Sequence, residues 1–189
     1  MSRPLPPPWY REIAPSVGAD GPYVFSCEHA SNNFGPVAAF GTDRALLDQH
    51  WAFDLGAAEL TTALVEQTRS VGILSTYSRL LLDPNRLLSS SSLFVDTIEG
   101  QPVLCNQTLD DAERAERIKC LHKGYHDGLD QLLKRRLAQR DVALISLHSF
   151  TPVWSGRARD VEIGVLFDER EEEAHALVDF LRAQGYDCR

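Results

Sequence analysis

The sequence has few cysteines, no excess of positive charge and no long hydrophobic run, and each absence excludes a class of protein. Its four cysteines, Cys27, Cys105, Cys120 and Cys188, form no Cys-x-x-Cys pair. This spacing fits neither a disulfide framework nor a thiolate zinc site, so we expect reduced cysteines. With 19 basic against 27 acidic residues, the formal net charge is -8. The chain therefore lacks the basic surface that binds nucleic acid.

No apolar run approaches the roughly 20 residues that a membrane-spanning helix needs. The N-terminus carries a proline cluster at residues 4–8 in place of the apolar core of a signal peptide. These features predict a cytoplasmic protein with no membrane partner. A length of 189 residues with 43% hydrophobic content is typical of one globular domain. We expect that domain to cover residues 21–189, after a proline-rich, extended lead-in of residues 1–20.

Short runs rich in β-branched and aromatic residues alternate with longer segments of helical periodicity. This alternation predicts an α/β fold with three layers, in which helices cover both faces of a mostly parallel central sheet. The helix that follows Thr108 has a capping-box-like start, Thr108-x-x-Asp111. The expected strands are residues 23–27, 71–77, 142–147 and 161–167, and the expected helices are residues 42–69, 108–140 and 169–184.

Two histidines directly follow apolar runs that we expect to be strands. His29 follows the first run and comes after Glu28, and His148 follows the third. Parallel strands end at the same edge of a sheet, where open α/β folds bind their ligands. Both imidazoles would then reach one rim and could share a zinc ion. The alternative for His29 is a hydrogen bond within a polar turn.

His50, Asp54 and His126 each allow a structural and a functional interpretation. His50 and Asp54 stand one helical turn apart, so they could bind a metal together, or Asp54 could bind it with His50 as support. An ordinary pair on a helix surface explains them equally well. His126 lies beside the apolar stripe of the long helix, which suits either a hydrogen-bonded core histidine or a residue at the active-site rim.

The segment of residues 79–86 places two arginines and an asparagine just after the second strand. Arginine binds carboxylates through two parallel hydrogen bonds, so Arg79, Asn85 and Arg86 form a candidate anion clamp. The alternative is a loop arginine that pairs with Asp83.

The order of these motifs resembles that of the N-formylglutamate amidohydrolase family. The resemblance runs from about Gly21 to the C-terminus. That family is similar in core architecture to zinc carboxypeptidases and aspartoacylase. It implies a zinc carboxypeptidase-like fold and hydrolysis of a small N-acyl amino acid, with N-formylglutamate as the type substrate. The motifs are residues 27–32, 50–56, 79–86, 123–126, 146–150 and 162–166.

Carried over to this sequence, the resemblance implies one zinc ion bound by His29 and His148. Asp54 is our choice for the third ligand, and Glu28 is the reserve. The His-x-x-Glu spacing of carboxypeptidases would require a glutamate at Asn32, which this sequence lacks.

The resemblance also implies how a substrate is bound and attacked. Asn85 and Arg86 match a carboxylate clamp, to which we add Ser149 and His126 as substrate contacts. Arg79 matches the arginine that polarises the scissile carbonyl. Water activated by zinc would then attack the amide.

A general base is the missing part of this scheme. Related domains continue with an Asp-Asn-Glu-Pro-Tyr-like loop and a late strand that carries a glutamate, whereas this sequence ends at residues 185–189 without either. We therefore expect a C-terminally short domain, which is either a natural or cloned truncation or a shorter form in which another carboxylate, Glu28 or Glu162, acts as the base.

Two other functions compete with this one. A non-catalytic relative would keep the clamp and bind a small carboxylate ligand without turnover. A serine hydrolase would use Ser149 or Ser31, although the sequence has no G-x-S-x-G motif. The sequence gives no indication of the oligomeric state.

Overall fold

The structure is a computed structural model that describes residues 8–34, 44–154 and 156–189. Residues 1–149 and residues 150–189 form two separate compact units. In the described ranges, no helix is both long enough and apolar enough to cross a membrane.

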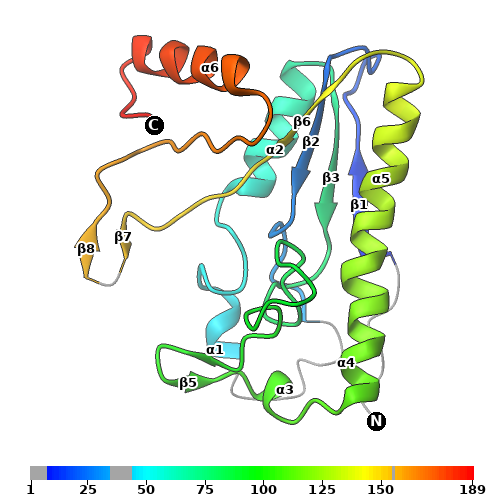
Figure 1. Ribbon diagram of the computed structural model, residues 1–189, viewed down its shortest axis with the longest axis vertical. Coiled ribbons are helices and arrows are strands. Elements are labelled where there is room, and N and C mark those ends of the chain that lie inside the picture. The colour runs from blue at the N-terminus through cyan, green and yellow to red at the C-terminus, as the bar shows by residue number, and fades with distance from the viewer. Residues whose placement is uncertain (1–7, 35–43, 155) are drawn as a thin grey trace. The chain divides into compact units, whose positions relative to one another are not determined.

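The first unit is built around a four-stranded sheet in the order β1-β3-β2-β6 (Figure 1). The central strand β2 (Tyr23–Cys27) runs parallel to both of its neighbours, β3 (Val71–Ser75) and β6 (Ala143–Ser146). The edge strand β1 (Tyr10–Ile13) pairs antiparallel with β3. The first three predicted strands are thus confirmed, the second and third with shorter bounds. Strand β1 lies in the expected lead-in and was not predicted, because its two middle residues are exposed, the outer two are only partly buried, and the run carries no alternating pattern.

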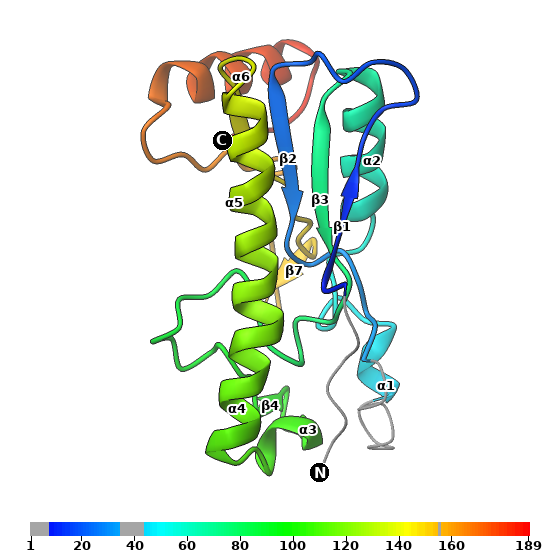
Figure 2. The ribbon, with the colours of Figure 1, turned by 90° about the vertical axis from the view of Figure 1, so that its right-hand side faces the viewer.

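Helices pack on both faces of this sheet (Figure 2). Along β2, successive side chains point to opposite faces. Val24 packs with Tyr125 and Leu132 of α5 (Gly124–Leu137), whereas Cys27 packs with Ala57 of α2 (Ala57–Gln67). The prediction of an α/β fold is confirmed.

The prediction of one continuous helix over residues 42–69 was wrong. It is two helices, α1 (Arg44–Leu47) and α2, separated by an irregular segment. Gly56 precedes α2 with a φ of 77°, a left-handed conformation that favours glycine. His50 and Asp54 therefore do not share a helix face. The His50 ring instead lies against Trp51, with the ring centroids 4.1 Å apart.

The long helix predicted for residues 108–140 is present, with a wide turn inside it. It consists of α4 (Asp111–Arg117), a π-helical turn (Ile118–Lys123) and α5. The expected start at Thr108 was wrong, because Asp110 is the N-cap and its side chain accepts a hydrogen bond from the Glu113 backbone N–H at 2.7 Å. That bond satisfies one of the free amide donors at the helix start.

A second core lies beyond the carboxyl ends of the strands. Leu80, Leu81 and Leu82 are each at most 1% exposed and pack with Tyr77 and Phe94. Burying these leucines fixes the segment that carries Arg79 and Asp83. Around them lie α3 (Leu104–Gln107) and a hairpin of β4 (Thr97–Ile98) and β5 (Gln101–Pro102). All four cysteines are free, as expected.

The second unit contains a two-residue hairpin, β7 (Val153–Trp154) and β8 (Arg157–Ala158), and helix α6 (Glu171–Ala183). The helix confirms the prediction for residues 169–184. The strand predicted for residues 161–167 was wrong. That segment forms only one isolated bridge, between Ile163 and Cys188, and Leu166 is 97% exposed, so no sheet covers it among the residues described here.

Candidate metal centre

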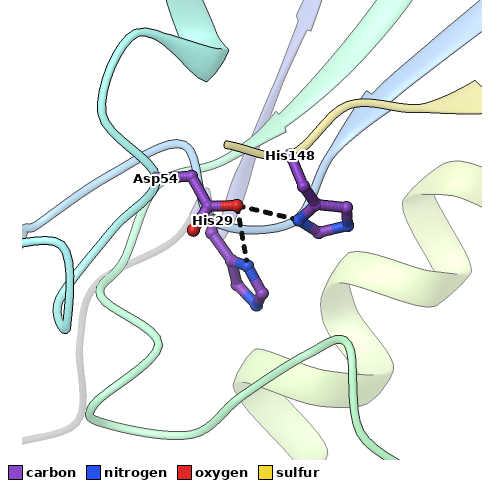
Figure 3. Close-up of side chains that lie close together, drawn as sticks. All are labelled: His29, Asp54 and His148. Carbon is purple, nitrogen blue, oxygen red and sulfur yellow. Dashed lines mark hydrogen bonds and ion pairs between the residues drawn. The ribbon is translucent and has the colours of Figure 1, made fainter. Parts of the chain in front are cut away.

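Two histidines leave the same edge of the sheet from neighbouring strands. Ser26 of β2 lies opposite Ser146 of β6 in the parallel register. Three residues after Ser26 comes His29, and two residues after Ser146 comes His148. The centroids of the two imidazole rings are 4.9 Å apart. Figure 3 shows the two rings close together beside Asp54. The prediction that parallel strands would bring these histidines together is confirmed.

Asp54 completes the group, although it arrives from an irregular segment and not from a helix. Its backbone N–H donates to the His29 carbonyl at 2.9 Å, which holds the two segments together. Its Oδ2 atom lies 3.3 Å from His29 Nδ1 and 2.9 Å from His148 Nδ1 (Figure 3). One ligand atom from each of the three side chains lies within 4.8 Å of the others. This group could hold a metal ion.

Both ring nitrogens of His29 face carboxylates. Nδ1 faces Asp54, and Nε2 lies 2.8 Å from Asp83 Oδ1. Burial disfavours the charged ring, but the hydrogen bonds to Asp54 and Asp83 outweigh it and raise the pKa of His29 above its ordinary value.

The two carboxylates stay ionised despite their burial. Burial raises the pKa of each, but hydrogen bonds from His148 and His29 hold the pKa of Asp54 well below its usual range. For Asp83, burial is likewise outweighed by its hydrogen bond and charge interaction with His29, which leave its pKa at about 2. Arg79 bridges the pair, with Nη1 3.4 Å from Asp54 Oδ1 and Nη2 2.8 Å from Asp83 Oδ2. The arginine thus shares its charge between both acids.

Glu28 lies on the other side of His148. Its Oε2 accepts a hydrogen bond from Ser146 Oγ at 2.5 Å and lies 3.4 Å from His148 Nε2. Its Oε1 accepts a hydrogen bond from the Tyr125 hydroxyl at 3.2 Å. Burial, with the Glu28 charge nearby, raises the pKa of Tyr125 well above its ordinary value, so this hydroxyl keeps its proton and remains a donor.

The clamp residues lie beside the histidines. Asn85 Nδ2 is 3.3 Å from His148 Nε2, and Arg86 Nε is 3.7 Å from Asp83 Oδ2. Ser149 reaches the group through its backbone N–H, which lies 3.3 Å from Asp54 Oδ2. Arg79 pairs with Asp83, so the structural alternative for that arginine also holds.

The remaining sequence candidates make other contacts. His126 Nε2 contacts the Pro84 carbonyl at 2.9 Å. Ser31 Oγ accepts a hydrogen bond from the Asn33 backbone N–H at 3.1 Å. Glu162 lies in the second unit, where its carboxylate accepts a hydrogen bond from the Asp187 backbone N–H at 2.9 Å.

Sequence reasoning gave no part in the metal site to three residues that contact the candidate ligands or Glu28, although it named Asp83 as the alternative partner of a loop arginine. They are Asp83, Tyr125 and Ser146. Ser146 is two residues before His148 on a predicted strand, so it could have been found from the alternation of side chains. Asp83 and Tyr125 have no such signal, because their partners lie far away in the sequence.

Comparison with known proteins agrees with the motifs. A family model for N-formylglutamate amidohydrolase matches residues 21–189. The crystal structure of gene product Atu2144 from Agrobacterium tumefaciens is 31% identical, with a TM-score of 0.87 over 95% of this chain and 71% of that chain. N-formylglutamate amidohydrolase from Ralstonia eutropha JMP134 shares the fold at 19% identity, with a TM-score of 0.68 over 95% and 74%. No curated protein sequence matches the chain. The match over residues 21–189 shows that the chain belongs to the N-formylglutamate amidohydrolase family.

Proposed function

We propose that this protein is a zinc-dependent amidohydrolase that cleaves the amide bond of an N-acyl amino acid such as N-formylglutamate. The observation that carries the proposal is the approach of the His29 and His148 Nδ1 atoms to one carboxylate oxygen of Asp54. The proposal includes a three-layer, zinc carboxypeptidase-like architecture for the catalytic domain.

The chemistry of the donor set fits zinc. Two imidazoles and one carboxylate are a ligand set that catalytic zinc sites use, and three protein ligands leave a position open for water or substrate. The charges fit as well. Glu28, Asp54 and Asp83 are buried carboxylates, and their charge of -3 exceeds the charge of the two arginines that pair with them, Arg79 and the more exposed Arg86, which favours binding of a divalent cation. Asp83 would keep its contact with His29 Nε2 and so fix the ring while Nδ1 binds the metal.

Bound zinc would supply Lewis-acid activation of a water molecule and of the amide carbonyl. The residues of the chain would perform the remaining tasks. In this scheme Glu28 accepts the proton of the attacking water and returns it to the leaving amine. Its carboxylate is held by Tyr125 and Ser146 at the edge of the group, close to His148.

Arg79 would stabilise the negative charge that develops on the carbonyl oxygen. Its contacts with Asp54 and Asp83 use two N–H groups, and a guanidinium has further donors that can turn towards a substrate. Asn85 and Arg86, whose side chains are exposed beside the histidines, would bind the substrate carboxylate. Ser149 is a further substrate contact in the proposal.

Metal content and hydrolysis of N-formylglutamate, measured on one purified sample, test the proposal. We expect near-stoichiometric zinc and turnover in the wild type. His29→Ala and His148→Ala should lose both, whereas the control His175→Ala, in α6 of the second unit, should keep both. Zinc without turnover in the wild type would favour a non-catalytic relative that binds a small carboxylate. A wild type without zinc would refute the metal site.

One contact chain favours a second function, a serine hydrolase. Ser146 Oγ lies 3.1 Å from His148 Nε2, and His148 Nδ1 lies 2.9 Å from Asp54 Oδ2, which is the order of a Ser-His-Asp triad. Against it, the Ser146 hydroxyl donates to Glu28 at 2.5 Å, so its proton does not point to the histidine. Hydrolysis that resists chelators and disappears in Ser146→Ala would establish this function in place of the metal-dependent one.

A further inference from the structure

The segment that carries the candidate clamp is held through its backbone. Asn85 and Arg86 have exposed side chains, whereas Pro84 is buried between Asp83 and Asn85. Asp83 is fixed by His29 and Arg79, and its Oδ1 accepts the Asn85 backbone N–H at 2.9 Å. The side chains that would meet a ligand are thus exposed groups on a short, anchored backbone segment, and the position of that segment decides where they reach.

Two histidines of the long helix bind the carbonyl groups on either side of Asn85. His126 Nε2 lies 2.9 Å from the Pro84 carbonyl oxygen, and His122 Nε2 lies 2.9 Å from the Arg86 carbonyl oxygen. A carbonyl oxygen can only accept, so each Nε2 must carry a proton and donate it. The two rings also lie against each other, with their centroids 4.5 Å apart.

The helix is irregular where this pair begins. His122 lies in the π-helical turn and His126 in the regular helix that follows. The Leu121 carbonyl in this turn accepts a hydrogen bond from the Tyr77 hydroxyl at 3.0 Å, which ties the turn to the core that carries the clamp segment. Wide turns of this kind occur often at functional sites, because they change which side chains face a neighbouring segment.

We propose that His122 and His126 are positioning residues that hold the Asn85–Arg86 segment in its ligand-binding position. The inference rests on the proposed function, since it assigns the pair to the substrate clamp of that same site. It also replaces the expected role of His126 as a direct substrate contact, because its Nε2 is engaged by the Pro84 carbonyl. The pair touches the backbone of the clamp, and through it sets where the Asn85 amide and the Arg86 guanidinium meet the substrate carboxylate.

The test compares substitutions that keep or remove the Nε2–H donor. Glutamine places an amide N–H near the position of Nε2, whereas leucine fills similar space without a donor. We expect His122→Leu and His126→Leu to raise the KM for N-formylglutamate about fivefold each, the effect of one lost hydrogen bond, with kcat changed less. His122→Gln and His126→Gln should stay near the wild type. Lys119→Ala removes an exposed side chain from the same helix turn and serves as the control.

Zinc content and calorimetric binding of L-glutamate to the zinc-loaded protein separate the possible failures. A positioning role predicts unchanged zinc content and weaker glutamate binding in the leucine variants only. Lower thermal stability with unchanged KM and unchanged glutamate affinity would overturn the inference, since it would show a purely structural role. A wild type that binds glutamate without hydrolysing N-formylglutamate would refute the proposed function, and the binding comparison would still decide the role of the histidines. A wild type that neither binds glutamate nor hydrolyses N-formylglutamate would overturn both.

Discussion

Replacing Asp54 by asparagine should largely abolish the increase in the free energy of unfolding that zinc binding gives the protein. The change keeps the shape of the side chain and removes its charge. In the wild type, Oδ2 lies within 3.3 Å of His29 Nδ1, His148 Nδ1 and the Ser149 backbone N–H, and Oδ1 lies 3.4 Å from an Arg79 nitrogen. An asparagine offers one oxygen to these groups and turns a donor N–H₂ towards the rest.

The expected loss of zinc affinity, and with it of stabilisation by zinc, follows from the role of Asp54 as a ligand. Losing an outer partner of a metal ligand costs roughly 10–100-fold in affinity, so losing a direct ligand should cost at least about 100-fold. At free zinc about 100 times the wild-type Kd, binding adds about 2.7 kcal/mol to the free energy of unfolding of the wild type. With a Kd raised about 100-fold, the same zinc concentration adds only about 0.4 kcal/mol to that of Asp54→Asn.

Urea unfolding with zinc and with a chelator measures this difference for both proteins. In chelator, Asp54→Asn should itself be less stable by about 3 kcal/mol, because Arg79 and His29 lose a buried counter-charge. The reasoning fails if zinc stabilises Asp54→Asn as much as the wild type, or if zinc stabilises neither protein. His50→Ala, four residues earlier and packed on Trp51, is the matched control and should respond to zinc like the wild type.

Three further variants test separate parts of the structure. Arg79→Met should lower kcat about 100-fold or more with zinc content retained, since it removes the donor proposed for the developing oxyanion; unchanged kcat would exclude that role. Glu28→Gln should lower kcat by about 100-fold or more in steady-state assays, again with zinc retained, and full activity would assign the base elsewhere. Gly128→Ala should lower the free energy of unfolding in urea by about 1–3 kcal/mol, because a Cβ would come within 2.4 Å of the Tyr10 ring. A stabilised Gly128→Ala would show that helix propensity outweighs this contact.

The sequence carried enough information to predict the central strands and the meeting of His29 with His148. Strand β2 is an apolar run that ends at Cys27, and the alternation and parallel order then place the two histidines at one edge. The family resemblance supplied Asp54, which local pattern alone put on a helix beside His50. Instead of bonding within a helix, the Asp54 backbone N–H donates to the His29 carbonyl, a contact between residues far apart in sequence.

The sequence analysis missed strand β1 and wrongly predicted a strand at residues 161–167, for opposite reasons. β1 is a polar edge strand, and its pairing with β3 depends on tertiary packing, such as the contact of Tyr10 with the helix at Gly128. Residues 161–167 have the composition of a strand, yet their neighbours in the second unit offer only the bridge from Ile163 to Cys188. A segment forms a strand only where a neighbouring strand can pair with it, and composition indicates only its intrinsic β-propensity.

Asp83 illustrates most clearly which part of the site a sequence conceals. The sequence analysis named Asp83 as the alternative partner of a loop arginine, and Asp83 does pair with Arg79. The same carboxylate also orients His29, 54 positions away, through Oδ1 at 2.8 Å. Asp83 thus joins Arg79 to the His29 ring. Asn85, whose backbone N–H donates to Asp83, in turn contacts the His148 ring through Nδ2. The candidate clamp and the candidate metal ligands are therefore one connected network, so zinc content should be measured together with KM for every substitution in the clamp segment, to separate an effect on the substrate from one on the metal.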